Sequence, residues 1–305
     1  MNKNSRIYVA GHTGFVGSAL TCKLKDIGFK NLILRTHNQM DLVDQDKVDK
    51  LFKELRPEYV FLLAGKSGGI YANNAYPADF IYQNIAIQAN VIHAAYKYGA
   101  KKLLFPGSAC MYPKYCLLPM KEEYLLTGLI EPTNEPFAVA KIAGIKMCQS
   151  YNRQYKTNFI SVVPATIYGP GDHFDANGHV MAALIEKFCG KKEVKIWGTG
   201  KPKREFIFID DVADALIFLM QNYNESEIIN IGTGIEISIK SLAQRIKGVA
   251  KFQGKVTFET AKPDGMPRRL LDSTKLLNMG WRPKIDLEKG IKLACAWYKT
   301  NVKKL

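Results

Sequence analysis

Features that define several classes of protein are missing from this sequence of 305 residues. No apolar run reaches the roughly 18 residues that a membrane-spanning helix needs. Residues 1–6 lead directly into a strand-like segment without the apolar core of a signal peptide, so we expect a cytoplasmic protein. The 6 cysteines form no Cys-x-x-Cys pair, which argues against zinc and thioredoxin-like motifs and fits reduced thiols. We therefore expect no metal site and no membrane partner.

Clustered basic residues interleaved with aromatic side chains are also lacking. The chain carries 43 Lys and Arg against 28 Asp and Glu, a formal net charge of +15. These cations are spread along the chain, with only short pairs such as Lys191-Lys192. The pattern favours a solvated basic surface first, attraction of small polyanions second and nucleic-acid binding least. We expect no nucleic-acid partner.

What is present is an alternation of strand-like and helix-like segments in the N-terminal half. Apolar runs predict strands, and 3.6-residue periodicity predicts helices between them. The strands fall at 6–10, 32–34, 59–64, 102–105 and 159–163, and the helices at 15–27, 44–55, 77–98 and 135–155. This order predicts an α/β fold with a doubly wound parallel sheet.

Beyond residue 169 the pattern is looser and suggests a smaller, discontinuous second domain. Segments 206–209 and 228–231 look like further strands of the first domain. The predicted division is therefore 1–169 and 205–235 for the first domain, and 170–204 and 236–305 for the second.

A glycine-rich turn joins the first predicted strand to the first helix. Gly11, Gly14 and Gly17 have the spacing GxxGxxG, and Phe15 and Val16 open the helix. Such a turn lets backbone approach a pyrophosphate, which the N–H groups of the helix N-terminus then bind. A glycine turn without a ligand is the alternative, but the flanking strand and helix favour a Rossmann-type dinucleotide site.

The end of the second strand indicates which dinucleotide binds. NAD sites usually place Asp or Glu there, whereas this chain has Arg35. A guanidinium would accept the 2′-phosphate of NADP(H), although Arg35 could also be a simple surface cation. Ala64 and Gly65 follow the third strand and should line the cofactor.

The segments after the fourth strand contain residues typical of a catalytic site, but one expected hydroxyl group is missing. Ser108, Phe137 and Lys141 resemble the Ser–Tyr–Lys frame of the short-chain dehydrogenase/reductase family, with Phe in place of Tyr. Residues 137 and 141 are about one helical turn apart and so share a face. Phe137 cannot donate a proton, which fits a natural variant or a deliberately disabled enzyme.

The resemblance becomes specific along nearly the whole chain, from about residue 6 to 295. Segments 68–70, 78–84, 134–136, 140–146, 150–155, 178–180, 204–206 and 262–265 resemble the GDP-L-fucose synthases, an extended branch of that family. The resemblance implies epimerisation of GDP-4-keto-6-deoxymannose at C3 and C5, followed by reduction of C4 by NADPH.

Roles for individual residues also follow from the resemblance. Cys110 and His179 match the acid/base pair of the epimerisation, and Ser108 would hydrogen-bond the C4 carbonyl oxygen. Lys141 and His179 would also contact the cofactor. Asp41 and Leu42 match the pair beside the adenine.

The substrate and the partner subunit are implied in the same way. Val180, Lys187, Trp197, Arg204 and Arg268 are expected to bind the GDP-sugar. The helices predicted at 77–98 and 135–155 resemble a dimer interface, with an apolar face formed by Ile81, Ile85, Ala89 and Ile92. We expect a homodimer.

Departures from the family pattern leave the substrate open. Thr13, Thr166, Gly171 and His173 stand where the family usually has other residues. They permit a GDP-4-keto-6-deoxyheptose C4 reductase that acts after a separate epimerase. With Phe137, they also permit a catalytically silent protein that binds NADP or a nucleotide sugar.

Overall fold

Five strands of the first half of the chain and one later strand form a six-stranded, fully parallel sheet, which confirms the predicted α/β fold class. The computed structural model describes residues 1–175, 178–262 and 264–302. The strand order is β2-β1-β3-β4-β5-β9, with bounds Leu32–Ile33, Ile7–Ala10, Tyr59–Leu62, Lys102–Pro106, Phe159–Pro164 and Ile229–Ile231. The order reverses between β1 and β3, and ligands of such sheets bind beyond the carboxyl ends of the strands at this point.

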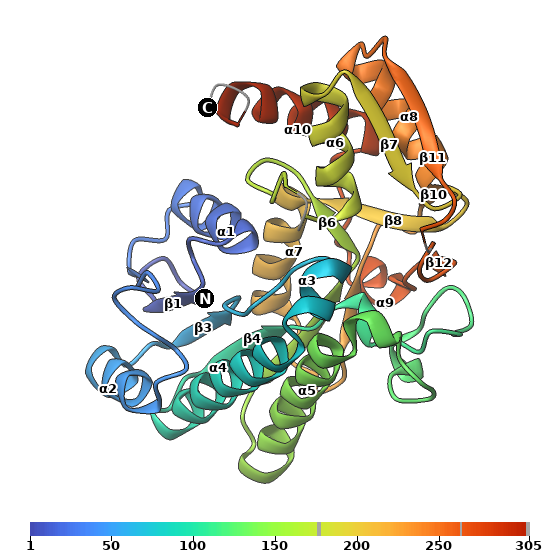
Figure 1. Cartoon of the computed structure of the whole chain (residues 1–305). Coiled ribbons are helices and arrows are strands. Elements are labelled where there is room, and N and C mark those ends of the chain that lie inside the picture. Colours follow the sequence, from blue (N-terminus) through green and yellow to red (C-terminus); the bar gives the residue numbers. More distant parts are fainter. Residues whose placement is uncertain (176–177, 263, 303–305) are drawn as a thin grey trace.

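Helices cover both faces of this sheet (Figure 1). α1 (Phe15–Asp26) and α7 (Ile209–Asn222) pack together on one face, and α2 (Gln45–Leu55), α4 (Pro77–Lys97) and α5 (Glu135–Tyr155) on the other. Residues near their N-termini determine where several of these helices begin. The Asp44 side chain accepts a hydrogen bond from the Lys47 N–H at 3.1 Å and caps α2. Pro77 and Pro136 stand in first turns, where a missing N–H costs nothing. The four helices predicted from periodicity agree with the structure within one residue at each end.

The remaining segments build a smaller lobe above the carboxyl edge of the sheet (Figure 1). β6 (Thr166–Tyr168), β8 (Lys203–Phe208), β10 (Glu236–Ser238) and β12 (Arg268–Arg269) form one small sheet, and β7 (Glu193–Trp197) pairs with β11 (Lys255–Glu259). The helices of this lobe are α6 (Val180–Gly190), α8 (Ile239–Ala250) and α10 (Leu287–Asn301). Short helices α3 (Ile70–Ala75) and α9 (Thr274–Asn278) and single 3₁₀ turns at Ala109–Met111, Glu122–Tyr124 and Pro132–Asn134 complete the described elements.

Strand β8 corrects one prediction. We expected segment 206–209 as a further strand of the first domain, but β8 pairs with β6, β10 and β12 and not with the large sheet. Its side chains alternate between two cores: Ile207 packs into the core of the large sheet, whereas Phe206 and Phe208 pack into the core of the smaller lobe. Ile209 is already the first residue of α7.

A buried carboxylate ties the smaller lobe to the end of β9. Glu205 Oε1 accepts from the backbone N–H groups of Thr233 at 2.6 Å and Gly234 at 2.7 Å, and Oε2 accepts from Leu271 N–H at 2.9 Å. Three chain segments are thus joined at the base of the small sheet. Within the described ranges, no helix is long and apolar enough to cross a membrane.

Candidate active site

A cleft of about 1120 Å³ lies between the carboxyl edge of the large sheet and the smaller lobe. Loops after β1, β3, β4 and β5 form one wall, and α6, β8 and β12 contribute the other. Parallel strands bring the ends of distant segments to one edge, so the predicted cofactor and catalytic segments meet here.

The glycine turn is shaped for close approach of a ligand. Gly11 has φ of +83°, and a Cβ there would lie 2.7 Å from the backbone nitrogen of Ala64. A Cβ on Gly17 would overlap the carbonyl oxygen of Gly11. Gly14, Phe15 and Val16 line the cleft at the start of α1. The turn therefore fits a dinucleotide pyrophosphate on the N-terminus of α1.

The predicted adenosine-side residues lie beside this turn and outside the cleft walls. Arg35 follows β2, is exposed, and donates through Nη1 to the carbonyl oxygen of Leu34 at 2.9 Å. Its backbone hydrogen-bonds His12 of the glycine turn. Asp41 is half-buried and caps its own turn through a bond from Val43 N–H, and Leu42 is buried. Arg35 is thus an exposed cation at the carboxyl edge of the sheet, next to the turn.

Ser108 and Cys110 stand together after β4. The Cys110 thiol donates to the Ser108 hydroxyl oxygen with a sulfur–oxygen distance of 3.3 Å. Cys110 is buried, and this burial raises the pKa of its thiol, whereas the nearby Arg269 and Lys141 cations oppose the rise. Both side chains line the cleft.

Lys141 lies one turn after Phe137 on α5, and both side chains line the cleft. The Lys141 ammonium is 4.6 Å from the ring centroid of Phe105 and 5.8 Å from that of Phe137. Because Lys141 is only 7% exposed, burial lowers its pKa to about 8. The Phe137 ring packs edge-on against Phe80 at 6.4 Å.

Gly65 keeps the space in front of this lysine open. A Cβ at Gly65 would lie 2.6 Å from Asn84 Oδ1 and 3.9 Å from Lys141 Nζ. Asn84 Oδ1 is buried and has no hydrogen-bond partner within the described part of the chain. An acceptor and a donor therefore face a gap that a ribose hydroxyl group fits.

His179 is the N-cap residue of α6 and lines the cleft, although its side chain makes no capping hydrogen bond. The residue is exposed to the open space of the cleft. The protein around the ring still desolvates it enough to lower its pKa, and the neighbouring Arg269 and His173 lower that pKa further. A neutral imidazole near neutral pH is suited to accept a proton.

Two arginines from adjacent strands face the cleft. Arg204 of β8 and Arg269 of β12 are paired in register, and both line the cavity. Burial, together with repulsion from Arg269, lowers the pKa of Arg204 to about 10. Burial also lowers the pKa of Arg269, against the opposing effect of Cys110 and Glu131. Arg269 Nε is buried without a hydrogen-bond partner in the ranges described. Two adjacent guanidinium groups, one of them with an unsatisfied donor, are suited to bind an anion.

The structure brings Arg269, rather than the predicted Arg268, into the cleft. Arg268 lies on the other side of the two-residue strand β12 and is exposed. Its Nη2 and Nε bind the Glu236 carboxylate at 2.6 and 3.1 Å. Successive side chains of a strand point to opposite faces, so only one of the pair can face the cavity.

The other predicted substrate residues also line the cleft. Trp197 is 58% exposed, with the Lys262 ammonium 5.4 Å from its ring centroid. Lys187 Nζ donates to the carbonyl oxygen of Lys195 at 2.7 Å, and burial lowers its pKa. Val180 lies at the start of α6 and also lines the cavity.

Three buried polar residues of the cleft were missed by sequence reasoning. Asn73 donates to the carbonyl oxygen of Gly68 at 3.0 Å, and Glu131 pairs with Lys114 at 3.1 Å. Asp172 is 7% exposed, and burial raises its pKa to about 7. All three come from loops or the short helix α3, where no periodic pattern reveals burial.

Comparisons with known proteins agree with this geometry. The family model "NAD dependent epimerase/dehydratase family" matches residues 7–232. The "Putative GDP-L-fucose synthase 2" of Arabidopsis thaliana is 52% identical over 99% of this chain and 94% of its own length. Two solved structures from Campylobacter jejuni are also similar. A GDP-6-OMe-4-keto-L-xylo-heptose reductase has a TM-score of 0.94 and 43% identity, over 98% of this chain and 99% of its own. A GDP-mannoheptose C4 reductase with NADP bound has a TM-score of 0.90 and 46% identity over the same shares.

Proposed function

Because the chain belongs to the NAD dependent epimerase/dehydratase family, we propose that it reduces the C4 ketone of a GDP-4-keto-6-deoxy sugar and exchanges the protons at C3 and C5. The observation that carries this proposal is one cleft in which Ser108, Cys110 and Lys141 face His179. The same cleft holds an arginine pair suited to a diphosphate. We also propose that Phe137 impairs the reductive step.

The cofactor is NADP(H), as in the similar reductase with NADP bound. The glycine turn would hold its pyrophosphate, and Arg35 its 2′-phosphate. The gap between Gly65, Asn84 and Lys141 would hold the nicotinamide ribose. NADPH, when bound, supplies the hydride for C4.

The GDP part of the substrate would lie at the other end of the cleft. Arg204 and Arg269 present donors that match diphosphate oxygens, and their mutual repulsion is relieved when an anion binds. The exposed Trp197 ring offers a surface on which guanine can stack.

Proton exchange requires an acid and a base on opposite faces of the sugar ring. Protons next to a ketone are acidic enough for a side-chain base, and a second group returns a proton with inversion. His179, neutral because of burial and Arg269, suits the base, and the Cys110 thiol suits the acid. The Ser108 hydroxyl can stabilise the developing charge on O4 by hydrogen bonding.

Reduction also needs a proton on O4, and none of the described residues that line the main cleft is a tyrosine. The position one turn before Lys141 holds the Phe137 ring. Loss of a general acid typically costs about 10² to 10⁴ in rate. We therefore expect exchange at the carbons next to the ketone to continue while little NADPH is oxidised.

The test is incubation of the protein with a GDP-4-keto-6-deoxy sugar and NADPH in deuterium oxide, followed by NMR. Deuterium at C3 or C5 with slow NADPH oxidation supports the proposal. The variants Cys110→Ala and His179→Ala should each abolish incorporation, and a variant of the exposed Asp46 of α2 is the matched control. Lack of both exchange and reduction with a bound substrate would refute the activity.

A second candidate is a C4 reductase that acts after a separate epimerase. It is favoured by the raised pKa of the buried Cys110 thiol, since a reductase needs no proton transfer at C3 or C5. Reduction without deuterium incorporation would identify it. Tight NADPH and GDP binding with neither reaction would instead indicate a catalytically silent binding protein.

We also propose a cytoplasmic homodimer built on α4 and α5, which pack side by side. Their outer face exposes apolar and aromatic side chains, including Tyr82, Ile85 and Tyr155 at 64%, 39% and 42%. Of the predicted face, Ile85 is exposed and Ile81 and Ala89 are half-buried, but Ile92 belongs to the core. Light scattering should give a dimer mass that Ile85→Asp converts to a monomer mass.

A further inference from the structure

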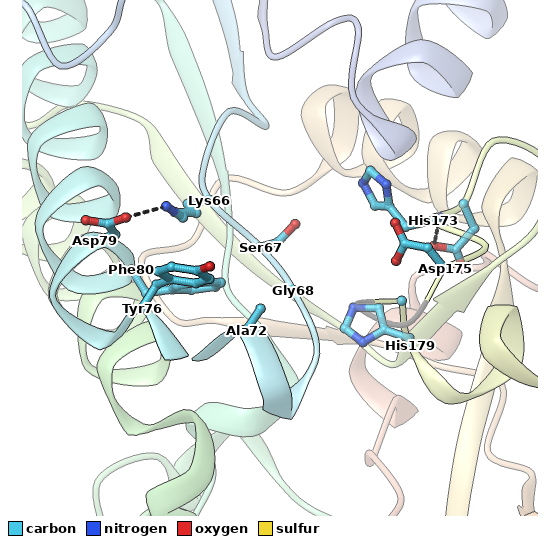
Figure 2. A pocket seen from close by; sticks show the side chains of 12 residues that line it. Lys66, Ser67, Gly68, Ala72, Tyr76, Asp79, Phe80, His173, Asp175 and His179 are labelled. Carbon is cyan, nitrogen blue, oxygen red and sulfur yellow. Dashed lines mark hydrogen bonds and ion pairs between the residues drawn. The ribbon is translucent and has the colours of Figure 1, made fainter. Parts of the chain in front are cut away.

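A second, smaller cavity of about 360 Å³ adjoins the cleft (Figure 2). One wall is formed by residues 66–68 after β3, by Ala72 of α3 and by residues 76, 79 and 80 at the start of α4. The other wall is formed by residues 172, 173, 175, 178 and 179. His179 and Asp172 line both this side cavity and the main cleft, so the two spaces meet at these residues. In Figure 2 the His179 ring faces this space from the opposite side to Ser67.

Asp172 is the most unusual wall residue of the side cavity. One carboxyl oxygen accepts from the His173 N–H at 2.8 Å, whereas Oδ2 is buried and has no partner in the part of the chain that the structure describes. A buried oxygen without a partner is costly, which suggests that a ligand group completes it. With its pKa raised to about 7, the carboxyl group can donate as well as accept near neutral pH.

The charge of the side cavity indicates what class of ligand group it can hold. Its wall residue Asp172 is acidic, and its lysine, Lys66, is already bound to Asp79 at 2.8 Å. Phosphate groups of the cofactor or of GDP would meet no unpaired lysine or arginine among the described lining residues, and they have their own cationic sites elsewhere. A neutral, hydroxyl-rich group is not repelled, and the hydroxyl of Ser67 and the imidazole of His173 can also bind it.

We propose that this side cavity binds the hydroxylated arm that a GDP-heptose carries beyond C6, with Asp172 hydrogen-bonding one of its hydroxyl groups. This inference rests on the proposed function, which assigns the protons at C3 and C5 to His179 and Cys110. An arm on C5 extends from a ring carbon next to His179, where the side cavity opens. The methyl group of a 6-deoxyhexose would leave the polar walls and the Asp172 oxygen unsatisfied.

The test compares two stable GDP-sugars that differ by one CH(OH) unit, GDP-mannose and GDP-manno-heptose. Their binding to the protein with bound NADP⁺ is measured by calorimetry, which does not depend on the missing phenol. The parent should bind the heptose at least about 10-fold more tightly, the amount expected for a hydrogen bond to a buried carboxyl group. Asp172→Ala should abolish this preference, and Asp172→Asn should retain part of it.

A steric variant gives an independent arm of the test. Ala72 lines the side cavity and not the main cleft, so Ala72→Leu should fill the cavity without touching the ring site. It should weaken heptose binding about 10-fold and change GDP-mannose binding less than about twofold. Asp46→Ala is the matched control, and thermal unfolding checks that every variant is folded.

Each outcome decides the proposal. Equal affinity of the parent for the two sugars would overturn it, as would equal weakening of both sugars by Asp172→Ala. Failure of the parent to bind GDP-mannose, GDP-manno-heptose or GDP would instead overturn the proposed function on which it rests.

Discussion

Phe137→Tyr is the substitution that most directly tests whether a missing phenol limits the reductive step. It adds one hydroxyl group to a ring that already lines the cleft and lies one helical turn from Lys141. Cβ atoms four residues apart on a helix are about 5–6 Å apart, so the new phenol and the ammonium can approach each other. We expect the variant to oxidise NADPH far faster than the parent on a GDP-4-keto-6-deoxy sugar.

The size of the gain follows from the surroundings of Lys141. At a separation of about 5 Å and an effective dielectric constant of about 20, an ammonium attracts a phenolate by about 3 kcal/mol. This attraction holds the pKa of the new Tyr well below its usual value and makes it an effective acid near neutral pH. A general acid typically contributes about 10² to 10⁴ in rate, or about 3–5 kcal/mol of barrier.

The pKa of Lys141 also determines how the rate gain from Phe137→Tyr should change with pH. Because burial lowers the pKa of Lys141 to about 8, the ammonium is present below that pH and is lost above it. The gain from Phe137→Tyr should therefore shrink as the pH rises above 8. Lys141→Met in the Phe137→Tyr background should remove most of it at every pH.

The assay is single-turnover NADPH oxidation, with deuterium exchange measured on the same samples. Exchange should change little, since it depends on Cys110 and His179, and NADPH affinity should be nearly constant. Equal NADPH oxidation by the parent and Phe137→Tyr, on a substrate that both bind, would show that another group is the acid.

Three further predictions concern binding and stability. Because of Arg35, the protein should bind NADPH at least about 10-fold more tightly than NADH, and Arg35→Ala should remove this difference in fluorescence titrations. Equal affinities of the parent for NADPH and NADH would refute this role of Arg35. Arg204→Ala and Arg269→Ala should each weaken GDP binding at least about 10-fold by calorimetry. Arg268→Ala loses only an exposed ion pair with Glu236 and should leave GDP binding unchanged. Weaker GDP binding by Arg268→Ala but not by Arg269→Ala would contradict the register of β12. Glu205→Gln places an NH₂ group where backbone N–H donors point. It should therefore lower the free energy of unfolding, measured by urea titration, by about 2–3 kcal/mol. An unchanged urea midpoint of unfolding would refute the bridging role of Glu205.

The parts of the fold that could be predicted are those that local pattern determines. The helices of the large sheet follow from 3.6-residue periodicity and from starts such as Asp44 and Pro77, and these features do not depend on distant partners. The glycine turn was readable because the strand before it and the helix after it are both local. Ser108, Phe137 and Lys141 were recognised instead by their resemblance to the Ser–Tyr–Lys frame, and all three line the cleft.

The parts that could not be predicted depend on pairing between distant segments. β8 has the sequence of a buried strand, but only its partners decide that it divides two cores instead of extending the large sheet. In the same way, the alternation within β12 decides that Arg269 faces the cleft, and β12 gets its orientation from pairing with Arg204. Asp172 looks like an ordinary loop carboxylate until the loop folds over it.

The two ends of the cleft therefore differ in charge for a structural reason. The small sheet brings Arg204 and Arg269 together across a strand pair, and a bound anion would offset their repulsion. The loop at 172–175 instead buries an acidic group beside the position expected for the sugar. A GDP-sugar has the matching polarity, with a diphosphate at one end and a neutral polyol at the other. We therefore expect the arginine pair to orient the substrate through its diphosphate, and the end of the cleft near Asp172 to distinguish one sugar from another.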